Sequence, residues 1–167
     1  MEVLIKETTS TSQSSADSKI RTAVNGFLNK SICGVIYPVV SELIMNIYQH
    51  ACVGDGINWQ VSIRLKEGVI ELSVEDEGIG ILGSILAKKD IKEASISEAL
   101  SVAVNYRGSN RNGRGTGLEL LRKRHSEGKI IKFSIHSSHG KYESCTKNVK
   151  ENNFVVNGTR ILVTFNV

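Results

Sequence analysis

The sequence predicts an α+β protein built as a two-layer α/β sandwich, and three observations support this class. Two amphipathic helical segments come early in the chain, strand-like segments follow in antiparallel pairs, and no shift in composition divides the chain in two. With 167 residues and 18.3 kDa, the chain has the size of one ordinary domain, so we expect a single domain over residues 1–167.

The N-terminal part of the chain predicts one short strand followed by two helices. Residues 3–5 are an apolar run typical of a strand, and the Ser- and Thr-rich residues 8–18 predict a surface connection. Residues 19–30 and 38–51 place apolar side chains at helical spacing. Because proline suits a first helical turn, we expect the second helix to begin at Pro38.

The middle of the chain predicts a hairpin and then a long, less regular segment. Residues 61–65 and 70–74 alternate apolar and polar side chains around a turn, as the strands of an antiparallel hairpin do. Residues 80–113 are rich in Lys, Ser and Asn and are long for a connection. Within them, residues 95–98 match a capping box and predict a short helix.

The C-terminal part of the chain predicts one helix and two strands. Residues 118–127 have a helical pattern, and Gly128 supplies a stop signal. Residues 131–135 and 161–165 alternate in the manner of strands, and the polar residues 147–157 between them predict a loop.

Composition narrows the classes of function. The net charge of +4 is small and its Lys and Arg residues are scattered, so we expect no nucleic-acid partner. We expect no membrane span, because no uninterrupted apolar run approaches about 20 residues. The N-terminus does not resemble a signal peptide. Cys33, Cys52 and Cys145 form no CxxC pair, which argues against a zinc site or a disulfide framework and favours the cytoplasm.

The first stretch that suggests chemistry is the predicted helix at residues 41–51. Glu42 and Asn46 are four residues apart and therefore share a helix face. A carboxylate and a carboxamide in that arrangement could supply a base and an oxygen ligand for Mg²⁺. A solvated polar helix face would explain the same pair.

The second stretch follows the predicted strand at residues 70–74. Asp76 stands at the strand end, with Gly78 and Gly80 behind it. A carboxylate there could accept a hydrogen bond from an exocyclic amine such as that of adenine, and glycines let a ligand approach the backbone. An ordinary turn is the alternative interpretation.

The third stretch, residues 107–118, carries glycines at positions 113, 115 and 117 and leads directly into a predicted helix. Backbone N–H groups at a helix start can bind phosphate, and Arg114 adds positive charge. The glycine spacing matches neither the dinucleotide fingerprint nor the P-loop. A flexible glycine loop without a ligand is the alternative.

In this order, the three stretches resemble the N box, G1 box and G2 box of the GHKL superfamily of ATP-binding proteins. The resemblance covers about residues 38–167, and Gly158-Thr159 resembles the superfamily's final Gly-Thr pair. The spacing of Asn46, His50 and Ala51 looks closest to the anti-sigma-factor serine kinases and similar stand-alone ATPase domains. The resemblance implies the Bergerat fold, with helices on one face of a mixed, mostly antiparallel sheet.

The resemblance also implies roles for individual residues in binding ATP and Mg²⁺. Asp76 would bind the adenine amine, and Thr159 would assist through a water. Asn46 would hold the Mg²⁺ that bridges the phosphates. Glu42 would be the catalytic base or would orient the attacking group.

The glycine-rich stretches would bind the rest of the nucleotide. Gly78 and Gly80 would admit the nucleotide and hinge a lid of about residues 80–117. The phosphates would lie against the second glycine box and its neighbours, namely Arg114, Gly115, Thr116, Gly117 and Leu118.

Three functions fit such a site. The first is a Mg²⁺-dependent serine/threonine kinase that acts on a regulatory partner, such as a sigma factor or its antagonist. The alternative is a nucleotide-gated binding module, a partner switch of the anti-sigma kind with little or no hydrolysis. The third is an ATPase subunit whose hydrolysis of ATP drives a neighbouring chain. A homodimer would be compatible with this function.

Overall fold

The computed structural model describes residues 2–51, 56–89, 93–105 and 117–166. One sheet runs through the molecule with the strand order β1-β2-β3-β5-β4. Its strands are β1 (Glu2–Thr8), β2 (Asn58–Lys66), β3 (Val69–Asp76), β4 (Ile130–Glu143) and β5 (Asn148–Asn166). All four neighbouring pairs are antiparallel, where the resemblance implied a mixed sheet.

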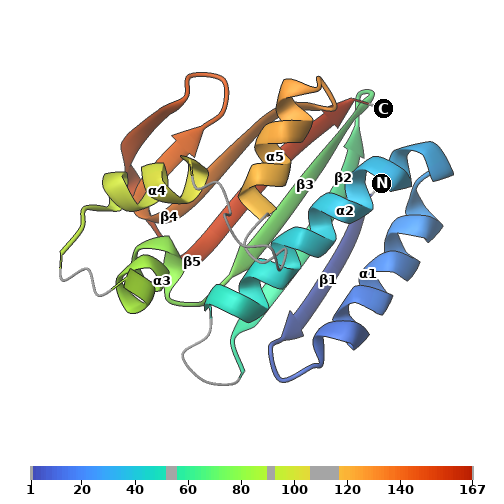
Figure 1. Cartoon of the computed structure of the whole chain (residues 1–167). Coiled ribbons are helices and arrows are strands. Elements are labelled where there is room, and N and C mark those ends of the chain that lie inside the picture. The colour runs from blue at the N-terminus through green and yellow to red at the C-terminus, as the bar shows by residue number, and fades with distance from the viewer. Residues whose placement is uncertain (1, 52–55, 90–92, 106–116, 167) are drawn as a thin grey trace.

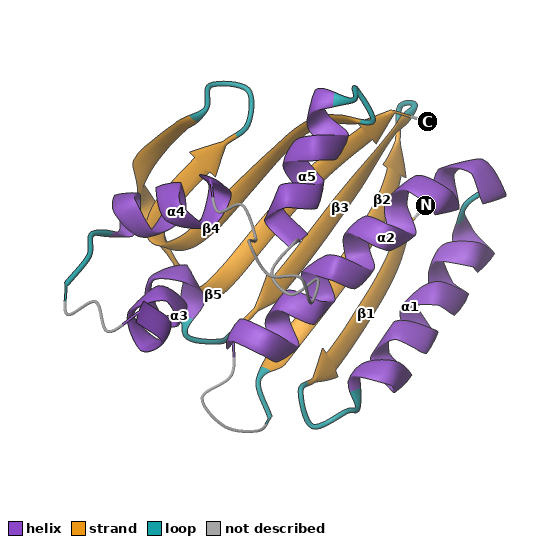
Figure 2. Cartoon of the chain, in the orientation of Figure 1, coloured by secondary structure: helices purple, strands orange, loops and turns teal. Residues whose placement is uncertain are grey.

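Helices cover one face of this sheet, which confirms the predicted two-layer sandwich (Figures 1 and 2). They are α1 (Gln13–Phe27), α2 (Lys30–Asn46), the π-helix η1 (Ile47–Ala51), α3 (Gly80–Lys89), α4 (Ile96–Asn105) and α5 (Gly117–Ser126). Figure 1 shows α1, α2 and α5 lying along the sheet, and α3 and α4 near the β4–β5 side. The opposite face of the sheet is not covered by any helix that the structure describes.

The first two helices begin earlier than predicted. The Ser12 hydroxyl accepts a hydrogen bond from the Ser15 N–H, so α1 includes residues that we expected in a surface connection. The Asn29 side chain accepts from the Ile32 N–H and caps α2, so Pro38 lies inside that helix and not in its first turn. In both cases a polar N-cap residue fixes the helix start several residues before the start that we predicted.

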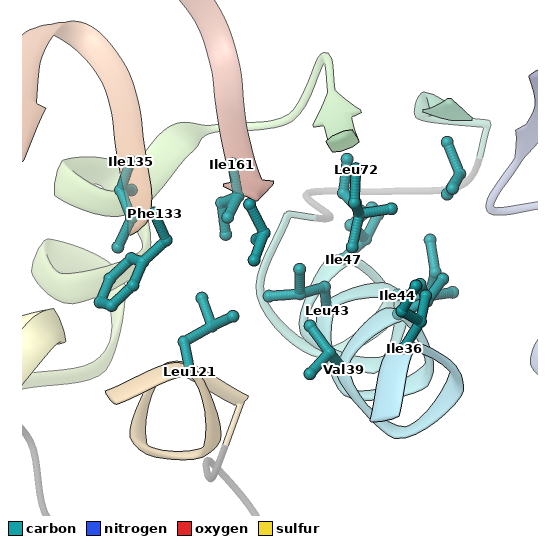
Figure 3. Packing of buried hydrophobic residues seen from close by; sticks show 14 of the residues in the cluster. Ile36, Val39, Leu43, Ile44, Ile47, Leu72, Leu121, Phe133, Ile135 and Ile161 are labelled. Atoms are coloured by element: carbon teal, nitrogen blue, oxygen red, sulfur yellow. The ribbon is translucent and has the colours of Figure 1, made fainter. Parts of the chain in front are cut away.

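The core forms where α2 and α5 pack on the sheet (Figure 3). Leu43 and Ile47 lie close to Leu72, while Leu121 of α5 points toward Phe133 of β4. These side chains are buried, and each contributes about 1.5–3 kcal/mol of transfer free energy.

The segment Lys30–Ala51, which comprises α2 and η1, is long and apolar enough by composition to cross a membrane. Polar residues interrupt this segment, so it did not stand out as an uninterrupted apolar run in the sequence. In the structure its apolar face packs on the sheet, as a core helix does, and the finding is weak support for a membrane span.

The predicted loop at residues 147–157 is wrong, because most of this segment is strand. Residues 148–156 belong to β5 and pair with β4, for example Val149 with Tyr142 and Lys150 with Lys141. The register shifts between Ser138 and Gly140, so extra residues of β5 bulge outward there. Most side chains in this part of β5 are exposed, so its sequence does not need to alternate apolar and polar residues.

The predicted capping box and helix stop are confirmed. The Ser95 hydroxyl accepts from the Glu98 N–H at 3.2 Å, and the Glu98 carboxylate accepts from the Ser95 N–H at 2.8 Å. Gly128 has a φ of +71°, which is the left-handed conformation expected just after a helix. Residues 80–113, which we expected to be less regular, contain both α3 and α4.

Candidate functional site

A mostly polar row of side chains, called the polar row below, crosses one end of the helix-covered face of the sheet. Side chains of register partners lie on the same face of an antiparallel sheet. The row is made of Glu7, Trp59, Asp76, Thr159 and Ser137, one from each strand. The neighbouring row is wholly apolar and consists of Ile5, Val61, Val74, Ile161 and Ile135. The apolar core therefore ends at Asp76, near the middle of the polar row.

Asp76 is the last residue of β3 and is only 8% exposed. The Gly78 N–H donates to its Oδ1 at 2.9 Å, and the Thr159 backbone N–H also donates to the carboxylate. Burial raises the pKa of Asp76 to about 6, although the two backbone hydrogen bonds act to lower it. This carboxyl has lost most of its water, so a ligand that brings N–H donors would stabilise the ionised form.

Gly78 places the turn after Asp76 directly against the end of η1. A Cβ at Gly78 would lie 2.4 Å from the Ala51 carbonyl oxygen, so no larger residue fits without displacing backbone. The same oxygen accepts a hydrogen bond from the Ile79 N–H at 3.2 Å. The turn and the helix that carries the N box are thus joined through Ala51.

Gly158 brings β5 equally close to Asp76. Its φ is +72°, and an added Cβ would lie 2.1 Å from the Asp76 carbonyl oxygen. Thr159, the next residue, is the register partner of Asp76. The Gly-Thr pair therefore lies beside the aspartate, as the resemblance implies.

Glu42 and Asn46 lie on α2 and are both half-buried. Asn46 ends α2, and η1 continues to the Ala51 contact with Gly78. Short π-helical segments are frequent at functional sites. The C-terminal end of α2, which carries the predicted metal ligand, therefore approaches the Asp76 turn.

The third predicted stretch is described only at its end. Gly117 begins α5, and the half-buried Leu118 packs against the core. Arg114, Gly115 and Thr116 lie outside the described residues. Helix α5 packs beside α2, and its N-terminal end lies on the same side of the molecule as the C-terminal end of α2 (Figure 1).

A hollow of about 550 Å³ adjoins the turn on the side of the β5 bulge. It is lined by parts of the turn and of β4 and β5, including Gly78, Gly80, Ser137 and Gly158. Gly78 and Gly80 of the predicted site line this hollow, whereas Asp76 and Asn46 do not.

Comparison with protein families decides the identity at the family level. The family described as histidine kinase-, DNA gyrase B-, and HSP90-like ATPase matches residues 35–166, well over half of the chain. The chain belongs to this family. No curated protein matches it.

The residues present fit the ATP that a histidine kinase-like ATPase binds. Asp76 offers a buried carboxylate acceptor, and Gly78 and Gly158 let the backbone approach closely around it. The Asn46 side-chain oxygen is a suitable donor for Mg²⁺. The structure places Asp76, Gly78, Gly80 and Thr159 together, and the end of α2 beside them.

Ser137 lies beside the turn after Asp76, and the sequence patterns had not singled it out. It is 1% exposed and contacts both Gly80 and Gly158. A signal was present, because Ser137 occupies the inward position that follows Phe133 and Ile135 in the alternation of β4. A polar residue at an inward position of a strand indicates a buried hydrogen bond.

Proposed function

We propose that this ATPase is a Mg²⁺-dependent serine/threonine kinase that transfers phosphate to a regulatory protein partner, such as a sigma factor or its antagonist. The proposal rests on the buried Asp76 carboxyl, which lies between two backbone N–H donors beside the end of α2. An acceptor in that position suits an exocyclic amine. The carboxyl would hold the adenine ring of ATP, so that the phosphates extend toward the predicted phosphate-binding groups.

Each residue then has a defined task. Asp76 accepts the hydrogen bond of the adenine amine, and Gly78 and Thr159 hold the carboxylate in place through their backbone N–H groups. The Asn46 side-chain oxygen would hold the Mg²⁺, which neutralises phosphate charge when bound.

Glu42 would act on the partner's hydroxyl, because it lies one helical turn before Asn46 on the same face of α2. Its carboxylate accepts the hydroxyl proton as the hydroxyl oxygen bonds to the terminal phosphorus of ATP. The bond between that phosphorus and the bridging oxygen breaks, and ADP leaves. Catalysis by this chain therefore consists mainly of positioning and one proton transfer.

The proposal is tested by phosphate transfer from labelled ATP to proteins that co-purify with the chain. We expect Glu42→Gln to lower the transfer rate about 100-fold or more while the affinity for ATP stays within about twofold, because it removes only the base. Glu71→Gln, an exposed carboxylate on the opposite face of the sheet, is the matched control and should leave both unchanged.

Two results would contradict the kinase. Labelled ATP could be bound without any labelled protein appearing, which would favour a nucleotide-gated binding module. Alternatively, Glu42→Gln could transfer phosphate at the rate of the unmodified chain, which would remove Glu42 from the reaction.

A further inference from the structure

A buried serine hydroxyl links the turn after Asp76 to β5. The Ser137 Oγ accepts a hydrogen bond from the Ile81 N–H at 2.9 Å. The same hydroxyl donates to the Gly158 carbonyl oxygen at 3.0 Å. One side chain of β4 therefore holds the start of α3 and the start of the Gly-Thr pair at once.

The contact with α3 replaces a helix cap. The first N–H groups of a helix have no acceptor within the helix, and Ile81 is the second residue of α3. Ser137 supplies the acceptor from a distant strand. The fit is tight, because a Cβ at Gly80 would lie 2.7 Å from the Ser137 Oγ, and Gly80 has a φ of +69°.

The hydrogen bond from Ser137 to Gly158 holds the segment of β5 that lies beside Asp76. Gly158 packs against the Asp76 backbone, and its neighbour Thr159 donates an N–H to the Asp76 carboxylate. Gly78, which donates the second N–H, lies two residues before Gly80. The two donors that hold the Asp76 carboxylate thus belong to the two segments that Ser137 joins.

The surroundings leave the turn room to move once this link is lost. Gly78, Gly80 and Gly158 line the hollow of about 550 Å³ beside Ser137, so the turn borders open space on that side. The Ser137 hydroxyl bonds to both the start of α3 and β5 and therefore contributes to the spacing between the turn and β5.

We propose that Ser137 is a positioning residue of the ATP site, which holds the Gly78 and Thr159 amides at the spacing needed to bind the Asp76 carboxylate. This inference rests on the proposed binding of ATP at Asp76. It predicts that loss of the hydroxyl weakens binding of the adenine ring and leaves the contacts with the phosphates unchanged.

Ser144 offers a matched control. It is 3% exposed, and its Oγ accepts a hydrogen bond from the Phe133 N–H at 2.9 Å. Ser137→Ala and Ser144→Ala therefore both remove a buried hydroxyl and leave one backbone N–H without its acceptor. They differ in that only Ser137 contacts the turn and β5 beside Asp76.

The experiment measures ATP and ADP dissociation constants of the full chain by calorimetry, and the amide proton shifts of Gly78 and Thr159 by NMR without nucleotide. We expect Ser137→Ala to weaken ATP and ADP by the same factor, about tenfold, for one lost positioning hydrogen bond. The Gly78 and Thr159 signals should move upfield as their bonds to the carboxylate lengthen. Ser144→Ala should keep the affinities within about twofold and leave both signals in place.

Each other result overturns one identifiable claim. ATP affinity and amide shifts unchanged in Ser137→Ala would overturn the positioning role while the proposed function stands. Equal losses in Ser144→Ala would reduce the effect to general destabilisation and would also overturn it. If Ser137→Ala does not fold, Ser137→Cys, whose somewhat larger thiol fills the position but makes weaker hydrogen bonds, is judged by the same criteria. An unmodified chain that binds no ATP would overturn the proposed function itself.

Discussion

At the scale of single residues, the burial of the Asp76 carboxyl lowers the stability of the folded chain. Its pKa of about 6 in the folded chain lies above the ordinary value of 3.8, because burial disfavours the ionised form. The folded state therefore binds more protons than the unfolded state between these values, and stability falls as the pH rises from about 4 to about 6. Above pH 6 the full cost is present, on the order of 3 kcal/mol.

The first prediction concerns this cost. Asp76→Asn should raise the free energy of unfolding of the nucleotide-free chain at pH 7.5, because it removes the buried charge. The gain should shrink at pH 4.5, where the unmodified carboxyl is mostly protonated. Urea denaturation at the two pH values measures both effects, and an equal gain at both would disprove the link to ionisation.

The second prediction concerns nucleotide binding and the same carboxyl. An amine donates most strongly to an ionised carboxylate, so ATP affinity should fall as the pH is lowered through about 6. The phosphates of ATP also titrate, and Asp76→Asn controls for them because it lacks the carboxyl. Calorimetry from pH 5 to 8 should show the extra loss only in the unmodified chain; parallel curves would exclude Asp76 as its source.

At the scale of elements, the sequence predicted correctly those features that depend on local signals such as caps and turns. It did not predict features that depend on contacts between distant segments. The hairpin of β2 and β3, the capping box of α4 and the stop at Gly128 follow local rules and were predicted correctly. The outer part of β5 was predicted as a loop, because most of its side chains are exposed and show no apolar alternation. Local patterns do not encode such pairing.

The same limit applies to the site. Asp76, Gly78 and Gly80 could be recognised because they form a local motif, and the structure brings Thr159 to Asp76 as the resemblance implied. The inward position of Ser137 in β4 indicated a buried hydrogen bond, but its partners could not be recognised, since they belong to two segments far away in the sequence. Residues that act through such contacts become visible only in the folded chain.

The third prediction compares two glycines on different elements. Gly78→Ala should lower ATP affinity at least tenfold and destabilise the chain, because the new Cβ would lie 2.4 Å from the Ala51 carbonyl oxygen. Gly34→Ala is the control. It lies inside α2 with nothing within 4 Å of an added Cβ, so it should stabilise the chain by up to about 1 kcal/mol. Thermal unfolding and calorimetry measure both variants, and normal ATP binding by Gly78→Ala would contradict the close fit of the turn.

At the scale of the whole molecule, the fold provides one covered face and one uncovered face of the sheet, and it places the site where the covered face loses its apolar character. The polar row ends the core, the end of α2 reaches it through Ala51, and α5 packs beside α2. Segments far apart in the sequence therefore meet around Asp76. The family assignment over residues 35–166 agrees with this arrangement.

The measurement that tests the central claim most directly is a calorimetric titration of the chain with ATP and with ITP, in which a carbonyl oxygen replaces the adenine amine. Since this oxygen would face the Asp76 carboxylate, we predict that ATP binds at least tenfold more tightly than ITP, and that Asp76→Asn removes most of the difference. Equal affinities of the unmodified chain for the two nucleotides would contradict the recognition of adenine by Asp76.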